Sequence, residues 1–272
     1  MGLGAVVAVL GIGAYLAAGF FSTPAKVKDK YETIQPVFED YAKAIGKITE
    51  DLKVESNFFD SAAFERALVK SENLIAEAEN AGKTLENLLS KSTLAPLADY
   101  QKNILEYINQ SKNIIKLERD IVDWGSAVSS PFRDYEELLV DVSGLSNYMV
   151  SDPDKYLEEL KKATEKERQI VEKLNQVAAD SEIGEMNMAL AQQMQAEVNF
   201  FEELSAAVAK RSTKLIAEAQ KNFTVESQAA GKEISRISDK LDEKVSKVTD
   251  ELTTLNSQVA EAGANLRREY RF

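Results

Sequence analysis

Apolar residues recur every three or four positions along most of the chain after residue 23. This spacing places them on one face of an α-helix, with Lys, Glu, Asn and Gln on the other face. The expected helices span about 24–55, 61–91, 96–128, 131–148, 153–179 and 185–222. Because each helix must bury its apolar stripe and the connections are short, we predict an antiparallel bundle of long helices.

Several residues mark where these helices begin and end. Thr23, Ser130 and Asp152 each precede a proline. Such side chains are favoured helix caps, and proline is well tolerated at the first helical position, so each pair predicts a helix start. Pro36 lies inside the first expected helix and should kink it or end a short leading turn. Trp124, the only tryptophan, is expected to anchor the end of the third helix or to line a pocket there.

After residue 223 the apolar pattern narrows to a seam. The spacing is that of a heptad repeat, with one four-residue stutter between Leu241 and Val245. The seam positions are Ile234, Ile237, Leu241, Val245, Val248, Leu252, Leu255, Val259, Ala262 and Leu266. We predict a coiled-coil helix ~65 Å long over residues 228–270. The seam could pack on a second copy, on a partner protein, or back along the bundle of the same chain.

Residues 2–21 contain no charged side chain. As a helix this run would be ~30 Å long, which matches the hydrocarbon thickness of a bilayer. Its large apolar residues are Leu3, Val6, Leu10, Ile12, Leu16, Phe20 and Phe21. We predict a retained single-pass transmembrane helix in contact with lipid. A removable signal peptide and a buried core helix are the alternatives, although a signal peptide would carry a positively charged leading region that this run lacks.

Two signals disagree about the side of the membrane on which the rest of the chain lies. Lys26, Lys28 and Lys30 follow the apolar run, and the positive-inside rule therefore favours a cytoplasmic body. A leading apolar segment is, however, usually read as an export signal. We expect an extracytoplasmic body.

The glycine content also indicates an all-α protein. Five of the 12 glycines lie in the opening run, which leaves seven for the remaining chain. A sheet protein of this length would need more turn residues. We therefore predict an all-α chain with three parts: a transmembrane anchor at 1–23, a helical bundle at 24–222 and a coiled-coil helix at 223–272.

The composition argues against most catalytic chemistry. The chain has no histidine and no cysteine, which removes the commonest general base, the usual zinc ligands and any disulfide. The net charge is −12, and no basic patch suited to a phosphate backbone stands out, so nucleic-acid binding is not expected. No glycine-rich phosphate loop or calcium-loop spacing occurs. We expect no catalytic residue, no cofactor and no metal.

These features favour a membrane-anchored, non-catalytic structural or interaction protein. Its bundle would project from the membrane, and its coiled coil would mediate assembly with a second copy or with a partner protein. Two other classes stay open on the sequence alone. One is a helical pore-forming or membrane-remodelling protein, and the other is a ligand-sensing helical bundle.

Overall fold

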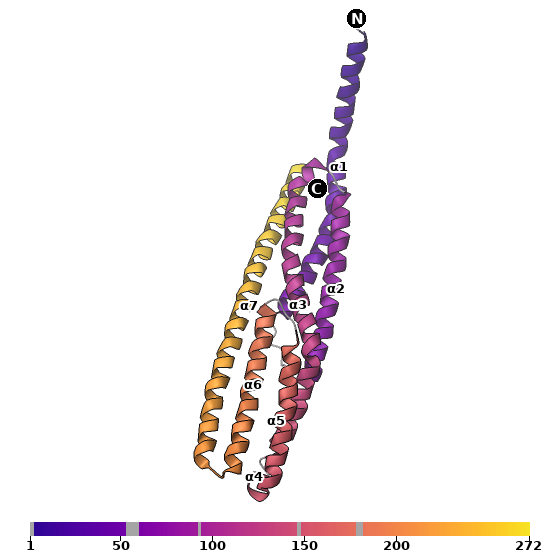
Figure 1. Ribbon diagram of the computed structural model, residues 1–272. Coiled ribbons are helices and arrows are strands. Elements are labelled where there is room, and N and C mark those ends of the chain that lie inside the picture. Colours follow the sequence, from indigo (N-terminus) through magenta and orange to yellow (C-terminus); the bar gives the residue numbers. More distant parts are fainter. Residues whose placement is uncertain (1–2, 53–59, 92–93, 146–147, 178–181) are drawn as a thin grey trace. The chain divides into compact units, whose positions relative to one another are not determined.

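A computed structural model describes the backbone of residues 3–52, 60–91, 94–145, 148–177 and 182–272, and most side chains in these ranges from residue 24 onward. The described residues form helices and connecting turns, with no strand, which confirms the all-α prediction. The elements are α1 (Leu3–Asp51), α2 (Ser61–Ser90), the 3-10 helix η1 (Ala95–Leu97), α3 (Ala98–Ser143), α4 (Tyr148–Ser151), α5 (Pro153–Asn175), α6 (Glu182–Ala209) and α7 (Thr213–Tyr270) (Figure 1).

The chain divides into two compact units, and the first consists of Met1–Asp51, Leu74–Lys116 and Lys247–Phe272. Its core is the predicted stripe of α1 together with apolar residues of α2, α3 and α7. The α1 members are all buried, namely Val27, Tyr31, Ile34, Phe38, Tyr41, Ile45 and Ile48. Phe38 meets Tyr107 of α3 edge to face, with ring centroids 5.2 Å apart.

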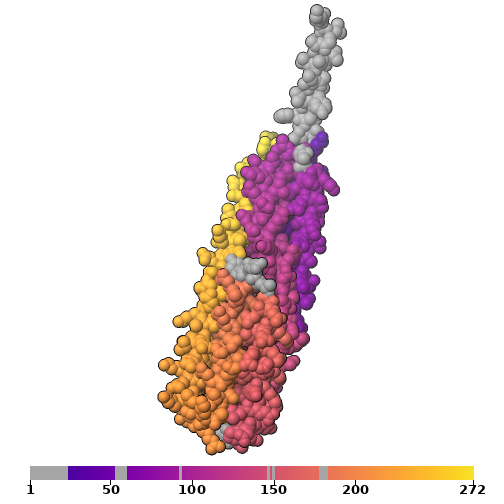
Figure 2. All heavy atoms as spheres, viewed as in Figure 1, coloured from indigo at the N-terminus to yellow at the C-terminus, as the bar shows by residue number. Residues whose placement is uncertain are grey.

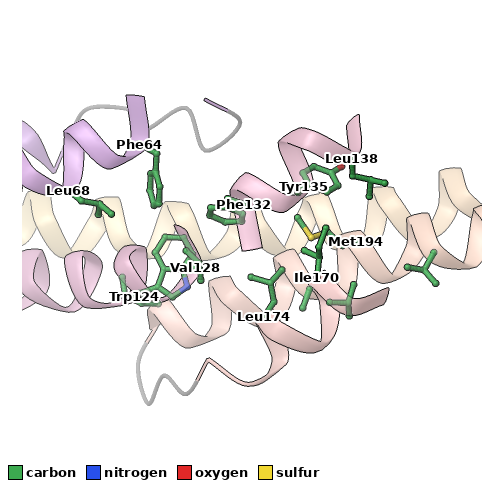
Figure 3. Close-up of a cluster of buried hydrophobic side chains, with 14 of the residues drawn as sticks. Phe64, Leu68, Trp124, Val128, Phe132, Tyr135, Leu138, Ile170, Leu174 and Met194 are labelled. Atoms are coloured by element: carbon green, nitrogen blue, oxygen red, sulfur yellow. The ribbon is translucent and has the colours of Figure 1, made fainter. Parts of the chain in front are cut away.

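The second unit consists of Leu52–Asn73 and Leu117–Ser246. Its core contains three rings in mutual edge-to-face contact, those of Phe64, Trp124 and Phe132, with centroids 5.8 to 6.5 Å apart. Figure 3 shows this core, to which α2, α3, α5 and α6 all contribute. In the space-filling view, α5, α6 and the first part of α7 form one face of the unit (Figure 2). Ion pairs join neighbouring helices here, such as Lys173 to Asp134 at 2.6 Å and Arg236 to Glu185 at 3.1 Å.

The predicted helix start at Ser130 is wrong, because α3 continues through Pro131 to Ser143. A proline inside a helix removes one hydrogen bond and costs about 3 kcal/mol. The apolar stripe offsets this cost, since Val128, Phe132, Tyr135 and Leu138 are all buried on one face of the uninterrupted helix. Burying each large apolar side chain contributes about 1.5–3 kcal/mol.

Trp124 consequently lies well inside α3 instead of anchoring a helix end. Pro24 likewise lies within α1, so the predicted start at Thr23 is not a helix boundary, and the helix also continues through Pro36. The start at Asp152 is confirmed. Its carboxylate accepts a hydrogen bond from the Lys155 backbone N–H at 3.1 Å, at the N-terminus of α5.

The helix expected at 185–222 ends at Ala209 instead, and residues 213–222 belong to α7. Arg211 adopts a left-handed backbone with φ 52°. The Ser212 N–H donates to the Ala207 carbonyl at 3.0 Å, and the Arg211 N–H donates to the Val208 carbonyl at 2.9 Å. These are the two bonds of a Schellman helix end, which is usually signalled by glycine. With an arginine at that position, the sequence pattern does not reveal the turn.

Candidate functional site

The predicted transmembrane segment is helical from Leu3 onward, as the first part of α1. Its side chains, including Leu3, Val6, Leu10, Ile12, Leu16, Phe20 and Phe21, lie outside the described residues. Among the side chains that the structure does describe, no helix is both long and apolar enough to span a bilayer.

The predicted coiled-coil seam lies along α7 and is half covered by the same chain. The buried members are spaced seven or eight residues apart: Ile237, Val245, Leu252, Val259 and Leu266. The alternate members are only partly buried: Ile234, Leu241, Val248, Leu255 and Ala262. One edge of the seam therefore belongs to the core of this chain, as in the alternative in which α7 packs back along the bundle.

Contacts within each unit show how α7 is held. In the first unit, a Cβ on Gly263 would lie 2.9 Å from the Tyr31 hydroxyl, so the helix backbone closely approaches that ring. The Asn103 side-chain amide donates to the Gln258 carbonyl at 3.3 Å. In the second unit, Val245 belongs to the same buried cluster as Trp124.

Glu167 is a charged residue type in the middle of an apolar core. It lies on the buried face of α5 and has 0 % of its surface exposed. Neither of its carboxyl oxygens has a hydrogen-bond partner among the described residues. Burying an unpaired carboxylate is very costly, so such a group takes up a proton instead.

Burial, together with the nearby Glu197 carboxyl on α6, raises the pKa of Glu167 to about 9. Glu197 itself accepts a hydrogen bond from the Tyr135 hydroxyl of α3 at 2.8 Å. Burial and the same carboxylate raise the pKa of Tyr135 well above its ordinary value. At neutral pH the second unit therefore holds a neutral Glu167 beside a hydrogen-bonded Tyr135–Glu197 pair.

The spacing of Glu167 relative to two leucines indicates that it is buried, although a pattern drawn from apolar residues alone leaves it out. The residue lies seven positions after Leu160 and seven before Leu174, and both leucines are fully buried. A position with this heptad relation to two core residues faces the core whatever its side chain. Extending the stripe through a polar residue would have placed Glu167 inside the unit.

Asn187 of α6 forms a second buried polar contact in this unit. The Trp124 indole N–H donates to the Asn187 side-chain oxygen at 3.3 Å, and the Asn187 amide donates to the Leu174 carbonyl at 2.8 Å. Asn187 is buried, and this pairing satisfies its polar atoms. The Asn187 amide thus links Trp124 of α3 to the backbone of α5, and Asn187 itself belongs to α6.

Aromatic residues gather where α1, α3 and the end of α7 meet in the first unit. The Tyr31 ring lies 5.2 Å from that of Tyr100 and 5.5 Å from that of Phe272. The Arg267 guanidinium carbon lies 5.6 Å from the centre of the Tyr31 ring. The Phe272 N–H donates to the Arg267 carbonyl at 3.2 Å, which turns the end of the chain back toward these rings.

Comparisons with known proteins relate this chain to no known family or structure. No protein-family model, no curated protein and no solved structure matches this chain. The function of the chain is therefore inferred from its own residues and contacts.

Proposed function

We propose that this chain is a membrane-anchored, non-catalytic structural or interaction protein. The observation that carries the proposal is that residues 3–21 of the uncharged run and the first core residues, from Val27 onward, belong to one helix, α1. A run of that length and composition matches the hydrocarbon core of a bilayer. The bundle would then be joined to the membrane by a continuous helix without an intervening loop.

The absence of catalysis is proposed on two grounds. The chain has no histidine and no cysteine. Among the described residues, the carboxyl with the most perturbed pKa is that of Glu167, which is fully buried, so a substrate could not contact it in this fold. A buried neutral carboxylic acid in a helix core is better explained as a packing feature than as a general acid.

Membrane fractionation tests the anchor. Full-length protein is expected to stay with membranes after alkaline carbonate extraction and to be released by detergent. Replacing Leu10 and Leu16 by arginine should weaken insertion, because each charge at the centre of a span costs about 2.5–3.5 kcal/mol. The matched control places the same arginines at Val69 and Val140, which are exposed in the bundle. Wild-type protein that carbonate releases would refute the anchor.

Protease protection tests the side of the membrane. We propose an extracytoplasmic body, so protease added to spheroplasts should digest the bundle. Digestion only after the membrane is permeabilised would place the bundle in the cytoplasm, as Lys26, Lys28 and Lys30 favour.

Assembly through α7 is proposed for the partly buried edge of the seam. Removing residues 225–272 would be a poor test, because Val245, Leu252, Val259 and Leu266 belong to the core. Replacing Val248 and Leu255 by glutamine changes the outer edge while leaving those core residues in place. Light scattering in detergent should show a larger species for wild-type protein and a smaller one for this variant. Val225→Gln, at a position 60 % exposed on the same helix, is the control. A strictly monomeric wild-type protein would refute self-assembly.

A further inference from the structure

The end of the first unit that adjoins residues 2–21 carries more positive charge than the composition of the chain suggests. The aromatic contacts of Tyr31 with Arg267 and Phe272 bring residues 24–32 of α1 beside the last turns of α7. Six cationic side chains lie in these two stretches, and we call them the basic collar: Lys26, Lys28, Lys30, Arg267, Arg268 and Arg271.

The basic collar is only partly neutralised. Three carboxylates, Asp29, Glu32 and Glu269, lie in the same two stretches of a chain whose net charge is −12. Lys28 lies 3.7 Å from Glu32. In the part of the chain that the structure describes, the other five collar residues form no ion pair with a carboxylate, and four of them are exposed. The cations are therefore available to an anionic partner.

The spacing along α1 determines which partner the basic collar can reach. Lys26 follows Phe21 by ~8 Å along the helix axis and Tyr31 follows it by ~15 Å, at ~1.5 Å per residue. Because Tyr31 contacts both Arg267 and Phe272, the arginines lie at a similar level. Charges within about one Debye length, ~8–10 Å at physiological ionic strength, act on a membrane surface. Long arginine side chains extend that reach, because their apolar stems let the charged head group extend toward the surface.

We propose that the basic collar binds the anionic headgroups of the membrane into which residues 2–21 insert. This inference rests on the proposed membrane anchor. The first unit would then be held at the surface by two helix ends, the start of the bundle part of α1 and the end of α7. Each collar cation near an anionic surface strengthens the interaction about fivefold, and the three carboxylates offset part of that gain.

A fluorescent reporter on α7 tests the proposal. The chain has no cysteine, so Asn265→Cys gives a single site for an environment-sensitive dye on an exposed position of the last turns. Full-length protein is reconstituted in vesicles of phosphatidylcholine alone or mixed with phosphatidylglycerol. The dye emission is expected to shift to the blue only in the anionic vesicles, and added salt should reverse the shift. The same emission in both vesicle types would overturn the proposal.

Charge variants separate headgroup binding from other causes. Replacing Arg267, Arg268 and Arg271 by glutamine should weaken docking about a hundredfold, while replacing them by lysine should preserve it. The matched control replaces three exposed lysines of the second unit by glutamine, namely Lys210, Lys214 and Lys221. A blue shift that survives in the arginine-to-glutamine variant, or that is lost equally in the control, would contradict the inference.

Two further measurements show whether a negative result contradicts the basic collar, the membrane anchor or both. Inorganic phosphate at matched ionic strength should leave the dye emission unchanged in detergent, and a shift there would assign the collar to free anions instead of lipid. Flotation with phosphatidylcholine vesicles tests the anchor itself. Protein that does not float refutes the anchor and the collar's place at the membrane together, whereas protein that floats with unchanged emission refutes only the collar.

Discussion

Replacing Glu167 by glutamine should stabilise the second unit, and the gain should grow as the pH rises. Glutamine has nearly the same shape and cannot ionise, so the substitution removes the proton uptake of the buried carboxyl without opening a cavity. In the folded chain the pKa of Glu167 is raised to about 9 by burial and by Glu197. In the unfolded chain the group has the ordinary glutamate pKa of about 4.3.

The sign of the pH dependence follows from this difference. Below the ordinary pKa both the folded and the unfolded state bind the proton, and the contribution of Glu167 to the free energy of unfolding is fully present. Between that pKa and about 9 only the folded state binds it, so the free energy of unfolding falls as pH rises, by about 1.4 kcal/mol per pH unit. Between pH 5 and pH 7, the wild-type second unit should therefore lose about 2–3 kcal/mol relative to Glu167→Gln.

Trp124 makes this measurement specific, because the only tryptophan lies in the same buried cluster as the α5 residues Ile170 and Leu174. Guanidinium unfolding of full-length protein in detergent, followed by tryptophan fluorescence, reports the stability of the second unit at each pH. Glu172→Gln, at an exposed position of α5, is the control and should follow the wild-type profile. A difference between wild type and Glu167→Gln that stays constant from pH 5 to pH 8 would refute the reasoning about buried proton uptake.

Substitutions at four positions of the second unit can be measured with the same fluorescence assay, supported by circular dichroism. Arg211→Gly should stabilise by about 1 kcal/mol, because glycine adopts the left-handed backbone of φ 52° without strain. Arg211→Lys should not change the stability. Equal stability of the two variants would contradict the helix-end geometry. Gly231→Ala should stabilise by about 1 kcal/mol, because no atom beyond the neighbouring helix backbone lies within 4 Å of the new methyl. Gly125→Ala places its methyl 2.4 Å from a leucine side chain and should be the less stable of the two. The reverse order would count against the packing. Asn187→Ala should destabilise by about 1–3 kcal/mol, since it removes the acceptor of the hydrogen bond that the Trp124 indole N–H donates in the core. Unchanged stability would show that this bond contributes nothing.

Most of the helices follow from local rules that the sequence displays. The stripe from Val27 to Ile48 is buried as its spacing predicts, and the cap at Asp152 begins α5. Such features depend on residues one or two helical turns apart, so a single segment contains all the information they need. The scarcity of glycine beyond residue 21 likewise excludes a turn-rich sheet before any contact is known.

The sequence patterns missed features of two kinds, a long-range packing effect in α3 and an unusual residue at the end of α6. Pro131 does not break α3, because the burial of Phe132 and Tyr135 against other helices outweighs a local cost. Arg211 ends α6 in a conformation that usually requires glycine, and the pattern alone gave no reason to expect a turn there. At Pro131, tertiary packing therefore overrides a local preference of about 3 kcal/mol.

The sequence by itself determined the helical class, the apolar run at 2–21 and the two residue stretches that carry the basic collar. Only the tertiary structure decided that the Glu167 carboxyl has no hydrogen-bond partner among the described residues, that one edge of the α7 seam is covered by its own chain, and that Arg267 and Phe272 lie beside Tyr31. The physical reason is that helix formation follows from the periodicity of neighbouring residues. Burial, pKa and the meeting of residues more than 200 positions apart depend on which helix faces pack together, and many packings satisfy the same stripes.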